Sequence, residues 1–186
     1  MNNSVEVRMW GTTVGYLGYE EDSDVAVFEY DAAFMNSNIF ISPINMNYPP
    51  ARHSFTDSSF RTFKGVPGVI ADSLPDKFGN QLIDQFMAEK NISPESITTL
   101  DRLLYVGSRT MGAIEYHPNK LNNESSNNGA LDIYLLSELA DLVVSNKGDL
   151  QKELKSADKR EDALKLIRVG SSAGGARSKA LVTKKP

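Results

Sequence analysis

This 186-residue chain carries, close to its C-terminal end, a stretch rich in small and basic residues: Val169-Gly170-Ser171-Ser172-Ala173-Gly174-Gly175-Ala176-Arg177-Ser178-Lys179-Ala180-Leu181-Val182. Small residues let the backbone come close to another group, and glycine tolerates positive φ values. Successive backbone N–H groups in such a segment can face a concavity that suits an anion. Arg177 and Lys179 add positive charge, and residues 180–183 are typical of the start of a strand. A glycine hairpin that leads into a strand covers the phosphates of ATP in protein kinases.

The spacing of these glycines alone does not identify a nucleotide site. Gly170 and Gly175 have the spacing of a P-loop, but Ala176 stands where that motif requires lysine. The pattern G-x-G-x-x-G is absent from the segment. On spacing alone, a plain flexible loop is therefore the favoured interpretation. The two basic residues and the following strand add support for a phosphate-binding loop, but they do not make it the favoured interpretation.

Two further stretches accompany the glycine-rich one. They are residues 65–79 (GVPGVIADSLPDKFG) and residues 101–116 (DRLLYVGSRTMGAIEY). Together with residues 169–180, and in this order, they resemble the HipA family, whose members are serine/threonine kinases that act as toxins in bacterial type II toxin–antitoxin pairs. The resemblance spans roughly the whole chain.

The resemblance implies an α+β fold with two parts. Residues 1–120 would form an antiparallel, β-rich N-terminal subdomain with packed helices. Residues 130–186 would add helices, the glycine-rich loop and the first strand of an incomplete protein-kinase-like core. The intervening residues 119–129 are rich in Asn and Ser, which is typical of a boundary.

The resemblance also implies a nucleotide site and a modification site. In this family a serine of the glycine-rich segment is phosphorylated by the kinase itself, which expels the loop and inactivates the enzyme. Matching the motif puts Ser172 at that position, and an alignment shift of one residue selects Ser171. A phosphoserine adds nearly two negative charges, which would repel the ATP phosphates. The implied phosphate-binding residues are Ser172, Ala173, Gly174, Gly175, Ala176, Arg177 and Lys179.

ATP and Mg²⁺ are the implied cofactors of the full-length kinase. The family pattern places its nucleotide lysine, catalytic Asp and metal ligands beyond Pro186. We therefore expect this chain alone to be inactive as a kinase and to bind neither cofactor tightly.

The implied partners are a HipB-like DNA-binding antitoxin and, as substrate, an aminoacyl-tRNA synthetase, which is glutamyl-tRNA synthetase for the best-known members. DNA contact would be indirect, through the antitoxin, in agreement with the net charge of −4. An alternative is a stand-alone, HipS-like antitoxin-type module that binds a separately encoded HipA-like kinase, since some relatives of the family are split in this way.

Composition limits the class of protein. The chain has no Cys, which excludes disulfides, thiolate catalysis and Cys-based zinc sites, and it has only two histidines. No apolar run approaches the roughly 20 residues of a membrane span, and the N-terminus lacks the pattern of a signal peptide. A cytoplasmic location is the default expectation.

Short β-like runs dominate the first third of the chain. Alternation over residues 5–8, 15–19 and 25–30, with Gly, Asp and Ser between the runs, predicts an antiparallel meander. Residues 38–43 read as an edge strand ended by Pro43, and residues 45–59 read as a loop. Residues 60–63 alternate again and predict one more strand.

Helix signals follow. Ser73 reads as a helix cap, with Pro75 and Asp76 in the first turn, and Ser93 reads as the cap of a second helix ending near Arg102. A helical stripe typical of core packing consists of Phe78, Leu82, Ile83, Phe86 and Met87. Residues 107–112 read as a glycine loop before a return strand. For Arg109 in this loop, a surface position is favoured over a contact with a ligand. Further helices are expected near 131–144 and 149–165.

Several acidic residues invite a catalytic interpretation that we reject. The spacing of Asp31 with Asn36, and of Asp141 with Asn146, matches a kinase catalytic loop, but neither pair follows His-Arg. Asp72 and Asp76 at a helix start are typical of helix-end electrostatics.

Overall fold

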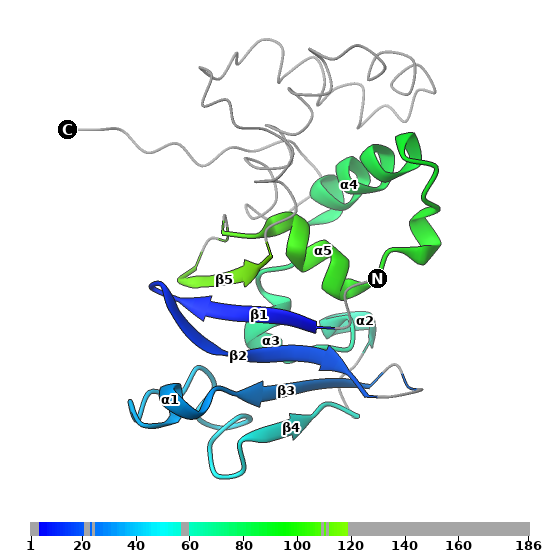
Figure 1. The fold of residues 1–186 in the computed structure, drawn as a ribbon. Coiled ribbons are helices and arrows are strands. Elements are labelled where there is room, and N and C mark those ends of the chain that lie inside the picture. The colour runs from blue at the N-terminus through cyan, green and yellow to red at the C-terminus, as the bar shows by residue number, and fades with distance from the viewer. Residues whose placement is uncertain are drawn as a thin grey trace, which may run out of the picture.

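An antiparallel sheet forms the centre of the part of the chain that the structure describes (Figure 1). The structure is a computed structural model, and it describes residues 4–20, 23, 25–56, 60–108, 110 and 112–118. The five strands, in the spatial order β4-β3-β2-β1-β5, are β1 (Ser4–Met9), β2 (Thr12–Tyr19), β3 (Ala26–Tyr30), β4 (Arg52–Ser54) and β5 (Ile114–His117). Every neighbouring pair is antiparallel, so the predicted β-rich meander is confirmed.

The β1–β2 hairpin has a tight two-residue turn. Trp10 and Gly11 both have positive φ, at 52° and 76°. This backbone matches the right-handed twist of the two strands, and glycine adopts it without strain. The Trp10 side chain stands at the tip of the hairpin with 76% of its surface exposed.

One face of the sheet is buried and the other is solvated. The inward side chains of β1 to β3 join helical residues in one core cluster, which includes Val5, Val7, Leu17, Phe28, Tyr30, Ile70, Leu100, Leu103, Leu104 and Tyr116. Alternate residues on the same strands, such as Tyr16 and Glu29, are exposed. The period of two is clear along β1, whereas Ala26, Val27 and Phe28 of β3 are all buried.

The helices cover the buried face in layers. They are α1 (Ala32–Met35), α2 (Phe60–Phe63), α3 (Gly68–Ala71), α4 (Lys77–Glu89), the 3₁₀ turn η1 (Pro94–Ser96) and α5 (Thr99–Val106). Helix α5 lies against β1 and β5 and also contacts α4 (Figure 1). Leu103 and Leu104 belong to the sheet cluster, whereas the Tyr105 ring meets Phe86 of α4 at a centroid distance of 6.2 Å.

The apolar stripe of α4 has the role that its spacing predicts. All five stripe residues are buried: Phe78, Leu82, Ile83, Phe86 and Met87. The Tyr105 hydroxyl donates to Met87 Sδ at 3.0 Å, which adds a polar contact to the apolar packing. Helix α5 therefore lies between the sheet and α4.

Three of the predicted local structures are wrong. Residues 38–43 form no strand, and the edge position is taken by β4, which lies inside the predicted loop 45–59. Residues 60–63 form helix α2, because four residues with Phe at both ends also fit one helical turn. The predicted second helix is in fact two elements, η1 and α5, separated by Ile97 and Thr98.

The helix caps also differ from those predicted. Asp76, not Ser73, caps α4, and its Oδ1 accepts from the Gly79 N–H at 2.8 Å. Ser93 makes no capping bond, whereas Thr98 and Asp101 form a reciprocal capping box at the start of α5. Helices α4 and α5 therefore begin after Asp76 and Thr98, further along the chain than the predicted caps Ser73 and Ser93.

The predicted helix end at Gly107 and the return strand are confirmed. Helix α5 ends at Val106, and Gly107 follows with φ of 61° and donates its N–H to the Leu103 carbonyl. Strand β5 then pairs with β1 and ends at His117, directly before Pro118. Within the described residues, no helix has the length and apolarity needed to cross a membrane.

Candidate functional site

The predicted phosphate-binding segment lies outside the described residues. This holds for Ser171 and for every implied contact: Ser172, Ala173, Gly174, Gly175, Ala176, Arg177 and Lys179. The expected helices of residues 130–186, Asp141 and Arg109 lie outside them as well. Any site formed by the described residues is therefore separate from this segment.

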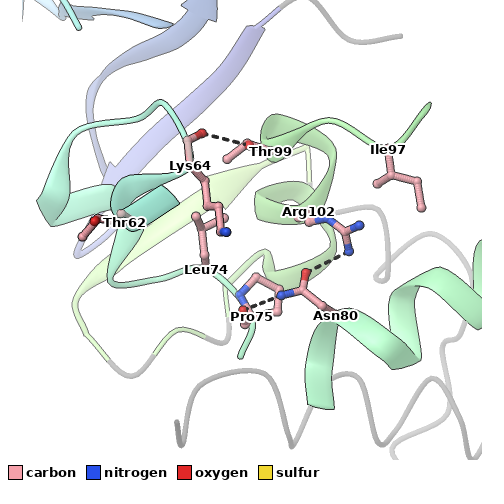
Figure 2. A pocket seen from close by; sticks show the side chains of 9 residues that line it. Thr62, Lys64, Leu74, Pro75, Asn80, Ile97, Thr99 and Arg102 are labelled. Carbon is pink, nitrogen blue, oxygen red and sulfur yellow. Dashed lines mark hydrogen bonds between the residues drawn. The ribbon is translucent and has the colours of Figure 1, made fainter. Parts of the chain in front are cut away.

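A groove opens between the loop after α2, the start of α4 and the start of α5 (Figure 2). Its volume is about 450 Å³. The described residues that line it are Thr62, Lys64, Ala71, Leu74, Pro75, Asn80, Ile97, Thr99 and Arg102. Two of these residues are cationic and none is acidic, although the whole chain has a net charge of −4.

Hydrogen bonds fix the Arg102 guanidinium at one side of the groove. It donates to Asn80 Oδ1 at 2.8 Å and to Asp84 Oδ1 at 2.7 Å, so α5 is tied to α4. The Asn80 amide in turn donates to the carbonyls of Pro75 and Asp76, at 2.8 and 2.9 Å. The orientation of Arg102 is thus set by two partners, one of which, Asn80, is itself held by backbone carbonyls.

The loop that carries Lys64 is held on the other side. Lys64 and Gly65 both have positive φ, at 55° and 78°, and the Thr99 hydroxyl donates to the Lys64 carbonyl at 3.1 Å. Lys64 is exposed, and Figure 2 shows its side chain reaching toward the space between Leu74 and Arg102. A left-handed backbone is unusual for lysine, and here a side chain of α5 anchors it.

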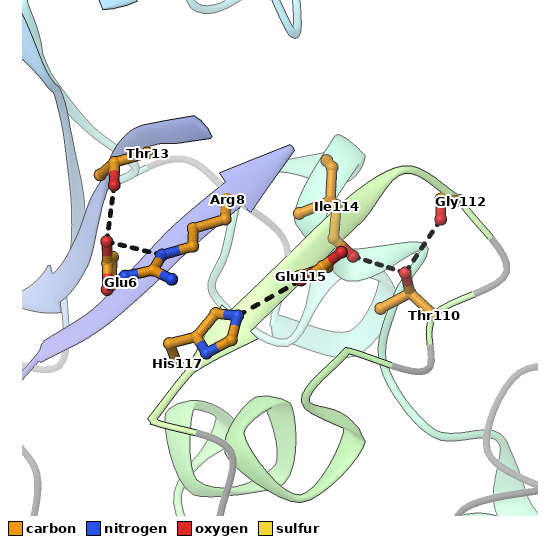
Figure 3. Close-up of polar contacts among 8 residues, drawn as sticks. All are labelled: Glu6, Arg8, Thr13, Thr110, Gly112, Ile114, Glu115 and His117. Carbon is orange, nitrogen blue, oxygen red and sulfur yellow. Dashed lines mark hydrogen bonds and ion pairs between the residues drawn. The ribbon is translucent and has the colours of Figure 1, made fainter. Parts of the chain in front are cut away.

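A second polar cluster occupies the solvated face of the sheet (Figure 3). The Glu6 carboxylate accepts from Arg8 Nε at 2.8 Å, from Arg8 Nη2 at 2.9 Å and from the Thr13 hydroxyl at 2.6 Å. The hydrogen bond from Arg8 is the largest cause of the lowered pKa of Glu6, and burial opposes it. On β5, Nε2 of His117 lies 3.3 Å from Oε2 of Glu115. A hydrogen bond thus connects β1 to β2 across this face, and the His117–Glu115 pair lies on the adjacent strand β5.

Three of the rejected acidic residues, Asp31, Asp72 and Asp76, lie at helix ends. Asp31 caps α1 by accepting from the N–H groups of Ala33 and Phe34, at 2.8 and 3.3 Å, and Asn36 is the C-cap of the same helix. Asp76 caps α4, and Asp72 ends α3. Within the described residues, no group of three His, Asp or Glu side chains is placed to hold a metal ion.

A comparison with protein families identifies this architecture. The model of the HipA N-terminal domain matches residues 5–117, from the first strand of the sheet to the last. The chain belongs to the HipA family. No curated protein and no solved structure matches the chain.

The HipA-like segments 65–79 and 101–116 meet in space. Ile70 from the first and Leu103 and Leu104 from the second share the core cluster. The groove is lined by both segments, with Leu74 and Pro75 from one and Arg102 from the other. The resemblance of these two segments thus coincides with a contact that builds the interior of the HipA N-terminal domain.

Sequence reasoning missed the groove of this HipA domain. Lys64 immediately precedes the first family segment, and Thr99 lies two residues before the start of the second, so both fall just outside the recognisable motifs. The only local signal was the Thr98-x-x-Asp101 pattern, which marks the start of α5 and so places Thr99 and Arg102 in its first turn.

Proposed function

We propose that this chain is the N-terminal part of a HipA-like serine/threonine kinase toxin of a type II toxin–antitoxin system. The observation that carries this proposal is the match of the HipA N-terminal domain to residues 5–117. In the sequence, the Gly- and Ser-rich segment 170–179 follows this domain, in the order that the family resemblance requires.

In this proposal the described domain binds partners, and phosphoryl transfer belongs to the rest of the kinase. Its solvated face carries paired charges and the half-exposed ring of Tyr16, and the exposed ring of Trp10 stands at the tip of the hairpin. Trp, Tyr and Arg are the residues most enriched at the energetic centres of protein interfaces. These features support a protein partner, for which a HipB-like DNA-binding antitoxin is the proposed candidate.

The glycine-rich segment would supply contacts to ATP in the complete enzyme. Backbone N–H groups of residues 172–176, with Arg177 and Lys179, would surround the phosphates, and Mg²⁺ would be held by residues of the kinase core. Phosphorylation of Ser172, or of Ser171 if the alignment shifts by one residue, would place negative charge against the nucleotide. The protein substrate would be an aminoacyl-tRNA synthetase, and DNA would be contacted only through the antitoxin.

The second candidate is a HipS-like module that neutralises a separately encoded kinase. The match to the N-terminal domain fits this candidate equally, because both proteins would contain that domain. The presence of segment 170–179 favours the kinase, since a module that only binds needs no phosphate loop.

The reading frame downstream of the Pro186 codon separates the two candidates. A frame that continues into sequence with a catalytic Asp and metal-binding Asp and Asn residues supports the kinase toxin. A stop codon followed by a second frame that encodes the kinase core contradicts it and supports the binding module.

A further inference from the structure

We propose that the groove between the loop after α2 and the starts of α4 and α5 binds a small organic anion, one with a phosphate or carboxylate group next to an apolar body. Lys64 and Arg102 would contact the anionic group, and Leu74, Pro75 and Ile97 would contact the apolar body. This site is separate from the glycine-rich segment and does not depend on the proposed kinase activity.

The size and lining of the groove favour a small ligand. A volume of about 450 Å³ falls in the range of roughly 300–1,000 Å³ that is typical of small-molecule sites. Such sites combine an apolar lining with a few polar groups that fix orientation. Here polar groups make up slightly more of the lining than apolar ones, and its apolar part consists of Ala71, Leu74, Pro75 and Ile97.

The charge of the groove selects an anion. Lys64 and Arg102 both line it, and its described lining contains no carboxylate. Asp84 lies outside the lining, but it pairs with Arg102 at 2.7 Å and so offsets part of that charge. Lys64 therefore supplies most of the net attraction for an anionic ligand.

The geometry of Arg102 suits an anionic group without rearrangement. A guanidinium has five N–H donors, and the bonds to Asn80 and Asp84 do not use all of them. Because these bonds fix its orientation, little conformational entropy is lost when a ligand binds. The Arg102 side chain is 19% exposed, so the ligand would meet it in a partly desolvated position.

The anchored backbone of Lys64 adds a second element of preorganisation. The Thr99 hydroxyl and the left-handed conformations of Lys64 and Gly65 fix the point from which the lysine side chain extends. The side chain itself is exposed and reaches toward the groove (Figure 2). The fixed guanidinium of Arg102 and the side chain of Lys64, whose backbone is anchored, thus line the same groove.

The test is an NMR titration of the ¹⁵N-labelled 186-residue chain with three probes: phenyl phosphate, benzoate and inorganic phosphate. We expect saturable shifts of the amide signals of Thr62, Lys64, Asn80 and Thr99. Phenyl phosphate or benzoate should bind at least about threefold more tightly than inorganic phosphate, because only these two carry an apolar body. Whichever aromatic probe binds more tightly shows whether the groove prefers a phosphate or a carboxylate group.

A matched pair of variants tests whether the charge of Lys64 attracts the ligand. Lys64→Gln should weaken binding of the stronger probe about tenfold, the effect of losing one charge-assisted contact. Lys90→Gln removes the same charge at the far end of α4 and should leave the affinity within about twofold. Lys64→Asn provides a second variant, because asparagine tolerates the left-handed backbone at this position.

Three outcomes would overturn the proposal. One is the absence of saturable shifts at the groove with all three probes. Another is equal weakening by the Lys64 and Lys90 variants, which would mean diffuse electrostatic attraction. The third is that inorganic phosphate binds as tightly as the aromatic probes, which would mean an adventitious ion only.

Discussion

The guanidinium of Arg102 on α5 donates to the carboxylate of Asp84 on α4 across 2.7 Å. This bond and the bond from Arg102 to Asn80 connect the two helices at the edge of the groove. The side chains of Arg102 and Asp84 are 19% and 31% exposed, so solvent screens the pair only in part.

Arg102→Met should lower the free energy of unfolding by about 1–2 kcal/mol, because hydrogen bonds to charged groups contribute more than exposed ion pairs do. The matched control is Arg52→Met. The distance from Arg52 to Glu20 is 3.7 Å and both side chains are well exposed, so we expect a change within about 0.5 kcal/mol. Urea denaturation of both variants measures the difference, and equal effects would mean that Arg102 does not tie α5 to α4.

Asp76→Ala should cost about 1 kcal/mol of stability, because it removes the side chain that accepts from the Gly79 N–H. Ser93→Ala is the control, since Ser93 precedes η1 without a capping bond from its side chain. Its effect should stay within about 0.3 kcal/mol. Thermal and urea unfolding of both variants check the assignment, which is wrong if the serine variant loses as much stability as the aspartate variant.

Gly15→Ala should destabilise the sheet by at least about 2 kcal/mol. A Cβ atom at Gly15 would overlap the carbonyl oxygen of Glu29 and would lie 2.7 Å from Cζ of the buried Phe28 ring. At Gly112 the same atom would meet nothing within 4 Å, so Gly112→Ala should change stability by less than about 0.5 kcal/mol. Comparable midpoints of denaturation for the two variants would contradict the close packing of β2 against β3.

Acid should weaken the Glu6 cluster. The pKa of Glu6 is lowered from 4.5 chiefly by the hydrogen bond from Arg8, so the folded state binds this proton less readily than the unfolded state. The stabilisation is therefore fully present above pH 4.5 and is lost as the pH falls through the lower folded value.

The stability advantage of the native chain over Glu6→Gln should accordingly shrink when the pH is lowered from about 6 to about 3. Urea unfolding across this range measures the difference. In an Arg8→Gln background the pH-dependent difference should be smaller, because the Thr13 hydroxyl still donates to Glu6. A difference that grows on acidification would have the wrong sign for the Glu6–Arg8 pair.

Much of the described fold could be predicted from local patterns. Alternation predicted β1 to β3, because apolar residues such as Val5, Val7 and Phe28 recur at the core-facing positions. The spacing of Phe78, Leu82 and Phe86 predicted the buried face of α4. Gly107 marked the end of α5 because only a residue that tolerates positive φ fits there easily.

Local patterns failed where tertiary contacts determine the structure. Residues 38–43 have an apolar run, but the Phe40 ring stacks on Tyr48 at 4.4 Å and the Tyr48 hydroxyl donates to the Ile39 carbonyl. These contacts hold the segment as a loop, and the short β4 takes the sheet edge. The choice between Ser73 and Asp76 as the cap of α4 likewise depended on where α3 ends.

The groove could not be predicted because its residues come from four separate segments. Lys64 and Arg102 are far apart in sequence. They line the same groove because α5 packs against both the sheet and α4. The two HipA-like segments were recognised individually, but their contact in the core is a property of the folded domain.

Phosphoryl transfer by the full-length gene product tests the central proposal most directly. The product is incubated with ATP and Mg²⁺, and residues 169–180 are then analysed by mass spectrometry. We predict phosphate on Ser172, or on Ser171, in the full-length protein, its loss when both serines are replaced by alanine, and no phosphate transfer by the 186-residue chain alone. Transfer by the isolated chain, or no transfer to any protein by the full-length product with ATP and Mg²⁺, would contradict the account.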